Sequence, residues 1–223
     1  MKSHLDSVVD KGAAAYMGTP GTIGLAIGIR HKGVSYFYSY GESKKGTGQL
    51  IKADQYFNLG SIAKTYVGTM LAEAVIEKKA NLNDDIRKYL PGNYPNLEYN
   101  GHPIRLLDLS NHTSGMPTSP GSFSVSVMDS VEKLALPGQI AFFSTYNQDS
   151  LLKALHHFKI DTIPGTKYRY NGNAMMVLML LLERIYKQPY EQLVTHYLKT
   201  HLQLYDTRTQ VPAGEFGRFV QGY

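Results

Sequence analysis

The chain has 223 residues and no cysteine, which excludes disulfide bonds and thiolate chemistry. It has no apolar run long enough to cross a membrane, because the longest one, residues 174–182, has only the length of a buried helix. The first twenty residues lack the apolar segment of a secretory signal. We therefore expect a cytoplasmic protein, or a periplasmic or extracellular one whose signal peptide has been removed.

Strong charge patterns and metal-binding spacings are missing as well. The 23 basic and 18 acidic residues give a net charge of +5, but the basic residues are scattered, and no nucleic-acid-binding motif is present. His156 and His157 are adjacent, and His196 and His201 are five residues apart, so no two histidines have the spacing of metal ligands. The sequence thus predicts neither a nucleic-acid partner nor a structural metal.

What is present is the composition of a globular protein, with 43% hydrophobic and 18% charged residues. The length suffices for one domain with a sizeable core or for two small domains. Two strands are predicted, over residues 22–30 and 34–40, joined by a tight turn at residues 31–33. A lone hairpin of this kind is only marginally stable in water. The second strand places on one face Val34, Tyr36, Tyr38 and Tyr40.

Helices dominate the rest of the sequence. Apolar residues at helical spacing, without proline, predict a long helix over residues 62–79. No internal repeat or low-complexity tract interrupts the pattern. The further predicted segments are short ones at 85–89 and 104–110, a loop through 117–145, and helices near 150–158, 173–186 and 190–201.

A serine followed three residues later by a lysine stands at the start of the long predicted helix, in the stretch Phe57-Asn58-Leu59-Gly60-Ser61-Ile62-Ala63-Lys64-Thr65. Helical spacing places the hydroxyl of Ser61 and the amine of Lys64 on one face. An amine in that position can serve as the base for a serine nucleophile. The structural alternative is a serine that caps the helix beside a solvated lysine.

The same spacing occurs twice more, at Ser130 and at Ser150. Ser150 opens a short helix whose polar residues indicate a surface position, and Ser130 precedes an ordinary amphipathic turn. Ser61 precedes a long apolar helix, whose positive end would lie near its hydroxyl and its backbone amide. These differences favour Ser61 as the nucleophile.

Three further segments follow Ser61 in a definite order. They are Asn81-Leu82-Asn83-Asp84-Asp85 with Lys88-Tyr89-Leu90-Pro91, then Leu106-Leu107-Asp108-Leu109-Ser110-Asn111-His112-Thr113-Ser114-Gly115-Met116-Pro117, then Pro164-Gly165-Thr166-Lys167-Tyr168-Arg169-Tyr170. In this order and spacing the chain, from about Gly21 to Tyr223, resembles the serine β-lactamase and penicillin-binding protein superfamily. The most similar branch holds class C β-lactamases, D-alanyl-D-alanine carboxypeptidases and related esterases.

The resemblance implies that Ser61 is the acylated nucleophile, that Lys64 is its proton-transfer partner, and that Tyr170 acts as or assists the general base. A phenol or an amine is mostly protonated at neutral pH, and it becomes a usable base only when a neighbouring cation and burial lower its pKa. The implied partner is a small-molecule or peptide substrate. Neither a metal nor an organic cofactor is implied.

Two departures from the family pattern bear on function. The family has an asparagine two residues after the tyrosine, where this chain has Gly172 between Asn171 and Asn173, so these three are the candidate substrate-binding residues. The sequence also reaches Tyr223 without the family's Lys/His-Thr-Gly motif, whose strand supplies half of the oxyanion hole. Losing one such donor costs about two to three powers of ten in rate. We therefore expect a fragment, or a second chain or second copy that completes the sheet.

The predicted fold is the α/β (α+β) architecture of β-lactamases, an antiparallel sheet flanked by helices beside a helical lobe. We expect a single such domain over residues 1–223 that lacks its C-terminal strands. The predicted function is a serine hydrolase that acts through a covalent acyl-enzyme on a β-lactam, a D-Ala-D-Ala peptide or a small ester. The alternatives are a non-catalytic relative, such as a penicillin-recognising sensor, scaffold or decayed paralogue, and a helical interaction module with chance motifs.

Overall fold

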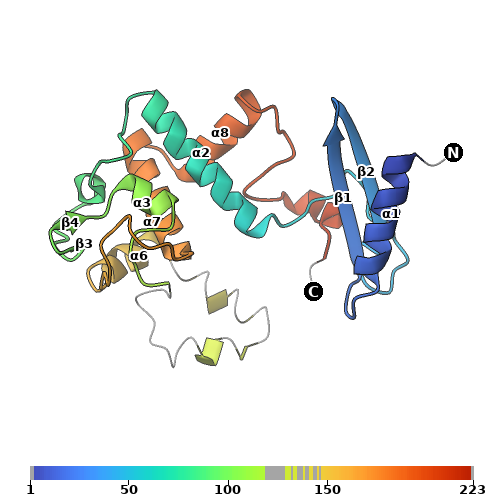
Figure 1. Cartoon of the computed structure of the whole chain (residues 1–223), viewed down its shortest axis with the longest axis horizontal. Coiled ribbons are helices and arrows are strands. Elements are labelled where there is room, and N and C mark those ends of the chain that lie inside the picture. The colour runs from blue at the N-terminus through green and yellow to red at the C-terminus, as the bar shows by residue number, and fades with distance from the viewer. Residues whose placement is uncertain are drawn as a thin grey trace. The chain divides into compact units, whose positions relative to one another are not determined.

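Residues 3–118, 129–131, 133–134, 138, 141–142, 145 and 147–221 are described by the computed structural model (Figure 1). The chain divides into two compact units. One, which we call the hairpin unit, consists of Met1–Gly60 and Asp206–Tyr223. The other, the helical unit, is Ser61–Tyr205.

The hairpin unit is built on two antiparallel strands, β1 (Gly24–His31) and β2 (Val34–Gly41), as the sequence predicted. Their register runs from Gly24 opposite Gly41 to His31 opposite Val34. The two turn residues both have positive φ angles, 47° at Lys32 and 79° at Gly33. Two consecutive positive φ angles define a turn whose twist matches that of the strands, and glycine adopts the second at no steric cost.

Helix α1 (His4–Met17), which the sequence pattern does not predict, lies along the hairpin (Figure 1). It begins with a capping box, in which the Ser3 hydroxyl accepts from the amide of Asp6 and the Asp6 carboxylate accepts from the amide of Ser3. The hydroxyl of Tyr38 donates to Asp6 Oδ1 at 2.8 Å, and that of Tyr40 donates to Asp10 Oδ1 at 2.6 Å. The tyrosine face of β2 is therefore joined to α1 through charge-assisted hydrogen bonds.

The hairpin unit also gathers a distant C-terminal segment around Tyr56. The short helix η3 (Ala213–Arg218) leads to Phe219, which pairs in parallel with Tyr56. The Tyr56 amide donates to Arg218 O at 2.8 Å, and the Tyr56 hydroxyl donates to Glu215 Oε2 at 2.5 Å. Residues separated by more than 150 positions thus meet at one buried aromatic ring.

Five α-helices of the helical unit have described bounds. They are α2 (Ala63–Ile76), α3 (Leu106–Ser110), α6 (Gln148–Leu155), α7 (Gly172–Tyr186) and α8 (Tyr190–Thr200). Two 3-10 turns, η1 (Gly60–Ile62) and η2 (Ile86–Tyr89), and a minimal hairpin of β3 (Glu98–Tyr99) and β4 (His102–Pro103) complete this description.

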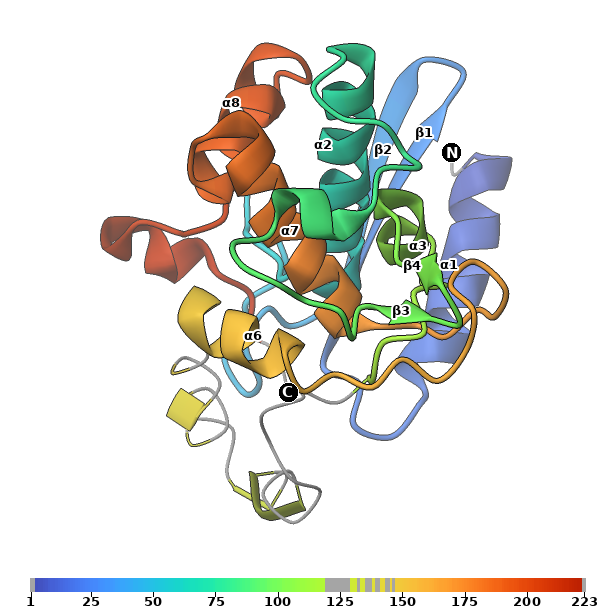
Figure 2. The ribbon, with the colours of Figure 1, turned by 90° about the vertical axis from the view of Figure 1, so that its left-hand side faces the viewer.

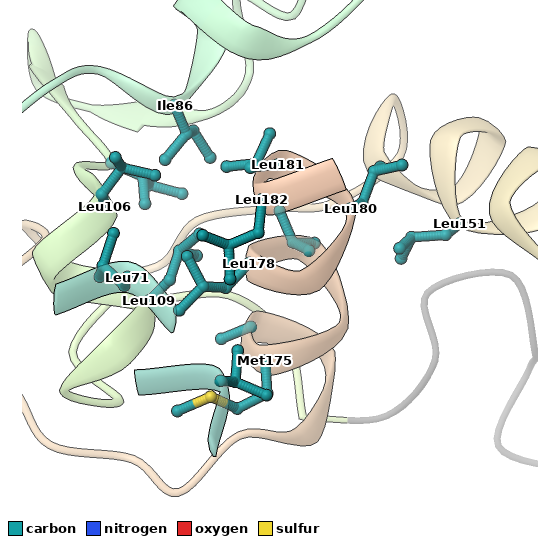
Figure 3. Packing of buried hydrophobic residues seen from close by; sticks show 14 of the residues in the cluster. Leu71, Ile86, Leu106, Leu109, Leu151, Met175, Leu178, Leu180, Leu181 and Leu182 are labelled. Carbon is teal, nitrogen blue, oxygen red and sulfur yellow. The ribbon is translucent and has the colours of Figure 1, made fainter. Parts of the chain in front are cut away.

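Helix α7 lies at the centre of the helical unit, in contact with α2, α3, α8 and η2 (Figure 2). Its apolar run is buried on nearly all sides, and leucines from α2, α3 and α6 surround it (Figure 3). Each fully buried leucine contributes roughly 1.5–3 kcal/mol of transfer free energy. The predicted helix at 173–186 is thereby confirmed as the core of this unit.

Element boundaries differ from the prediction in one instructive place. The long helix ends at Ile76 rather than at residue 79, because Lys78 takes a left-handed φ of 57° and the amides of Lys79 and Ala80 turn back to Ala74 O. Such a left-handed residue closes a helix. The predicted loop at 117–145 lies mostly outside the described residues.

Candidate active site

Ser61 lies in η1, immediately before α2. Helix α2 is held in place by its buried residues Val67, Met70, Leu71 and Ala74. The opposite side of its first turn is accessible, so Ser61 is exposed and Lys64 is half-buried. The amides of a first helical turn have no partner within the helix and carry the positive end of its dipole. Ser61 precedes this turn, in η1, and its backbone amide lies at the same end of the helix.

Two side chains converge on the Ser61 hydroxyl. Lys64 Nζ donates to Ser61 Oγ at 3.0 Å, and the Tyr170 hydroxyl donates to the same oxygen at 2.6 Å. Lys64 Nζ also lies 5.0 Å from the centre of the Tyr170 ring. Both side chains to which the family resemblance gives a role are therefore within hydrogen-bonding distance of Ser61, although 109 residues separate Ser61 from Tyr170.

Tyr170 is positioned by the start of α7. The next residue, Asn171, caps this helix, because its Oδ1 accepts from the amide of Ala174 at 3.1 Å. The Asn171 Nδ2 donates to Met116 O at 2.8 Å and to Pro117 O at 3.1 Å. The helix start is thereby tied to the 116–117 backbone.

The three candidate substrate-binding residues fall into two groups. The carboxamides of Asn171 and Asn173 are buried, with 2% and 3% exposure, and both donate to Pro117 O. Gly172 faces open space, since a Cβ there would meet nothing within 4 Å. Substrate binding by these residues stays a prediction, and the contacts of the two asparagines are those of structural residues.

The groups around Tyr170 make its phenol easier to ionise. The Lys64 amine beside it, and the Ser61 hydroxyl bonded to it, hold the pKa of Tyr170 below that of free tyrosine. Tyr170 is 49% exposed, so water screens part of this effect. Lys64 also acts on His112, whose pKa is lowered by burial and by this nearby charge.

His112 is a site residue to which the sequence pattern assigns no role. Its imidazole centroid lies 4.7 Å from that of Tyr170, and its Nδ1 accepts from the amide of Asn171 at 3.2 Å. His112 has a φ of 59°, a left-handed conformation that histidine adopts more readily than most residues. The sequence offered one signal, its place within the segment 106–117, but spacing alone gives no contact with Tyr170.

An ion pair supports the loop that carries His112. Asp108, 1% exposed, accepts from the Arg105 backbone amide at 2.9 Å and from its guanidinium at 3.0 and 2.9 Å. The amide of Gly165 donates to Thr113 O at 2.9 Å. Gly165 has a φ of 89°, and a Cβ there would approach Arg105 Nη2 to 2.8 Å, so glycine is needed at this crossing.

The two alternative serines have different surroundings. Ser150 lies in the first turn of α6, where its hydroxyl donates to the capping carboxamide of Asn147 at 3.2 Å. Its partner in the motif, Lys153, is exposed. Ser130 is exposed as well, and Glu132 in its motif lies outside the described residues. Among the described residues, Ser150 lacks the two converging partners that Ser61 has.

No group of three histidine, cysteine, aspartate or glutamate side chains within the described ranges could hold a metal ion. In the same part of the chain, no helix combines the length and the apolar character that crossing a membrane requires.

Comparison with known proteins decides the family. A family model described as Beta-lactamase matches residues 9–223. The chain belongs to this family. The resemblance inferred from the ordered motifs is thereby confirmed.

Among curated relatives, a β-lactamase of Lysobacter lactamgenus is 27% identical over 226 residues, which cover 100% of this chain and 52% of that protein. The D-alanyl-D-alanine-carboxypeptidase/endopeptidase AmpH of Escherichia coli K12 is 26% identical, over 90% of this chain and 49% of its own length. The chain thus spans about half the length of the curated relatives it matches.

Solved structures show the same fold. A β-lactamase/D-alanine carboxypeptidase from Yersinia pestis, complexed with citrate, superposes with a TM-score of 0.82 at 24% identity, over 96% of this chain and 58% of that one. The D-alanine carboxypeptidase AmpC from Burkholderia cenocepacia gives a TM-score of 0.76 at 26% identity, over 98% and 54%. The β-lactamase-like fold with antiparallel strands and a helical lobe is therefore confirmed, and the chain covers just over half of these two structures.

Proposed function

We propose that this chain carries the nucleophilic centre of a serine hydrolase, which acts through a covalent acyl-enzyme on a β-lactam, a D-Ala-D-Ala peptide or a small ester. The observation that carries the proposal is the convergence of Lys64 and Tyr170 on one serine hydroxyl, at 3.0 and 2.6 Å. Membership of the β-lactamase family and the names of the relatives support the substrate classes.

In the proposed acylation, Tyr170 in its phenolate form accepts the proton of Ser61 Oγ as that oxygen attacks the substrate carbonyl carbon. The Lys64 ammonium stabilises the phenolate, in keeping with the lowered pKa of Tyr170. The backbone amide of Ser61 donates to the oxyanion that develops on the carbonyl oxygen. When the tetrahedral intermediate collapses, the leaving nitrogen or oxygen takes a proton through Tyr170 and Lys64, and an ester on Ser61 remains.

Hydrolysis then requires one water molecule, which attacks the ester carbonyl and gives up a proton to the same pair of side chains. The products are the free acid and the regenerated Ser61 hydroxyl. This second step separates a hydrolase from the alternative, a sensor that keeps its acyl group.

Intact-mass spectrometry after incubation with a fluorescent penicillin and with a phosphonate probe tests the proposal. We expect one adduct per chain, and peptide mapping should place it on Ser61. Ser61→Ala should abolish the adduct without changing the melting temperature by more than about 2 °C, because the side chain is exposed. Ser150→Ala is the matched control, since it removes a serine of the same motif from another helix start.

An adduct on Ser130 or Ser150, or undiminished labelling of Ser61→Ala, would overturn the assignment of the nucleophile. Release of acid from the labelled protein then distinguishes turnover from permanent acylation. A burst followed by steady release identifies a hydrolase, and a stoichiometric adduct without release identifies a sensor.

We also propose that a second chain, or a second copy of this chain, completes the sheet of the hairpin unit. In the described residues β1 pairs only with β2, which leaves backbone donors and acceptors at the edges, and Phe37 on β2 is 42% exposed. Such an edge is a template for strand addition. Sedimentation velocity should detect a species larger than the 24.9 kDa monomer, and a purely monomeric protein with saturating probe labelling would contradict this.

The proposed place of action is the periplasm or the cell exterior, where D-Ala-D-Ala peptides of the cell wall and β-lactams are met. Fractionation of the source cells, with detection by the fluorescent penicillin, tests this location. Labelling confined to the cytoplasmic fraction would contradict it.

A further inference from the structure

His112 holds the backbone on both sides of Tyr170. The amide of Arg169, the residue before, donates to His112 O at 2.8 Å. The amide of Asn171, the residue after, donates to His112 Nδ1 at 3.2 Å. One residue thus accepts from the two amides that flank Tyr170, one through its main chain and one through its side chain.

The side-chain bond defines the protonation state of His112. A ring nitrogen that accepts a hydrogen bond carries no proton, so the one proton of the neutral imidazole is on Nε2. Protonation of Nδ1 would place two donors against each other at the Asn171 amide. Burial and the charge of Lys64 on α2 keep the pKa of His112 low, which preserves the accepting form.

The ring itself lies against the tyrosine that it supports. The imidazole and the Tyr170 ring are tilted by 44° at a centroid distance of 4.7 Å, and Tyr168 meets the imidazole edge-on at 6.0 Å. Aromatic pairs at these distances have preferred relative orientations. One face of the half-exposed Tyr170 ring therefore packs against His112, while the Tyr170 hydroxyl donates to Ser61 Oγ.

We propose that His112 is a positioning residue for Tyr170, and that its Nδ1 acceptor fixes the Tyr170 backbone so that the phenol stays within hydrogen-bonding reach of Ser61 and beside Lys64. This inference rests on the proposed function for its catalytic consequence, but the positioning itself is a property of the fold. The contribution of Nδ1 is separable from that of the ring, because different substitutions keep each one.

Two substitutions divide these contributions. His112→Asn places a carboxamide oxygen near the position of Nδ1 and suits the left-handed backbone, but it removes the ring. His112→Phe keeps a ring against Tyr170 and removes the acceptor, which leaves the Asn171 amide unpaired. His157→Asn, an exposed histidine after α6, is the matched control. Melting temperatures identify any variant whose changes come from unfolding.

The first measurement needs no catalytic activity. With tyrosines labelled at the ring carbon that bears the hydroxyl, NMR titration follows each phenol, and Tyr170→Phe identifies the resonance of Tyr170. We expect the pKa of Tyr170 to lie below that of free tyrosine in the unsubstituted chain and in His112→Asn. In His112→Phe we expect it to rise toward the value of free tyrosine, because the phenol leaves Lys64.

The second measurement is the rate of Ser61 acylation by the phosphonate probe. We expect a loss of about tenfold or more in His112→Phe, the order expected for an amide left without its acceptor. His112→Asn should recover most of this loss, and His157→Asn should show none. If the unsubstituted chain is not acylated, the proposed function fails, and the titration of Tyr170 still decides the positioning.

The outcomes that overturn the proposal are definite. One is a folded His112→Phe variant with unchanged Tyr170 pKa and unchanged acylation rate, which would make the Nδ1 acceptor dispensable. Another is equal damage in His112→Asn and His112→Phe, which would assign the effect to packing. A third needs no variant, since nitrogen chemical shifts that show a proton on Nδ1 of His112 at neutral pH would exclude the accepting role.

Discussion

At the scale of single residues, the site depends on two side chains that donate to one hydrogen-bond acceptor, the hydroxyl of Ser61. Ser61 Oγ receives both Lys64 and Tyr170, and the contact of Lys64 with the Tyr170 ring links the two bases. The i,i+3 spacing of Ser61 and Lys64 is a local property of a helix, so the sequence predicts it. The approach of Tyr170 depends on how α7 packs against α2, which spacing does not give.

Replacing Lys64 tests this arrangement directly. We expect Lys64→Ala to lower the rate of Ser61 acylation by about 10²–10⁴-fold, the usual contribution of a positioned acid or base, because the phenol of Tyr170 then loses its neighbouring cation. Lys153→Ala is the control, since Lys153 follows Ser150 with the same spacing in an exposed position. Burst kinetics with the phosphonate probe measure both rates, and equal effects would remove Lys64 from the mechanism.

Gly172 offers a gain-of-function test. It begins α7, its backbone is outside the left-handed region, and its Cβ direction is open, so an asparagine there introduces neither strain nor a clash. We expect Gly172→Asn to raise acylation by β-lactams and peptide amides about tenfold, through a carboxamide that can bond the substrate amide. Small esters, which lack that amide, should react unchanged.

Gly172→Ala is the matched control for the asparagine variant. It fills the same helix position without a carboxamide, so a rate increase shared by both variants would be an effect on α7 itself. No increase in Gly172→Asn with amide substrates would mean that this position does not face the bound substrate.

At the scale of elements, a helix or turn can be predicted from the sequence when residues close together in the chain determine it. The helix α7 and the turn at Lys32 and Gly33 are determined by residues adjacent in the chain, and the sequence predicts both. Helix α1 was not, because few of its side chains are fully buried and its attachment is polar, through Asp6 and Asp10 to tyrosines more than 25 residues away. Tyr56 and Phe219, which pair, are still farther apart in the chain, and no periodic pattern in the sequence indicates their pairing.

The tyrosine bonds between β2 and α1 make the hairpin unit sensitive to alkali. The carboxylate of Asp6 raises the pKa of Tyr38 to about 12, and that of Asp10 raises the pKa of Tyr40 to about 12. A raised folded-state pKa stabilises the fold fully below the unfolded value near 10, and this stabilisation is lost as the pH rises from about 10 to about 12. We therefore expect the denaturant midpoint of the hairpin unit to fall over this interval.

Tyr38→Phe and Tyr40→Phe together should lower the midpoint at neutral pH and flatten its dependence between pH 10 and 12. Urea unfolding followed by far-ultraviolet circular dichroism at stepped pH measures both effects. Tyr168→Phe is the control, because Tyr168 is 66% exposed and belongs to the helical unit. An unchanged alkaline slope in the double variant would show that these bonds do not form in solution.

At the scale of the whole molecule, the two units differ in how much hydrophobic surface they bury. The helical unit encloses a continuous hydrophobic core around α7 and contains Ser61, Lys64, Tyr170 and His112. The described strands of the hairpin unit form a two-stranded sheet, and sheets of that size need packing partners to be stable. The predicted family and fold are confirmed, and the predicted extent, one domain over residues 1–223, stays a prediction.

This difference predicts how a complementing polypeptide would act. A second chain that adds a strand beside the hairpin would cover an open edge of that sheet. We expect hydrogen exchange of the β1 amides to slow when such a segment is added, because the new strand pairs backbone groups that water otherwise reaches. Exchange of the α7 amides, already buried in the helical unit, should not change. The control is the same segment with two adjacent prolines at its centre, which removes backbone donors that a strand requires. Unchanged exchange of β1, or equal protection by both segments, would contradict strand addition to the hairpin.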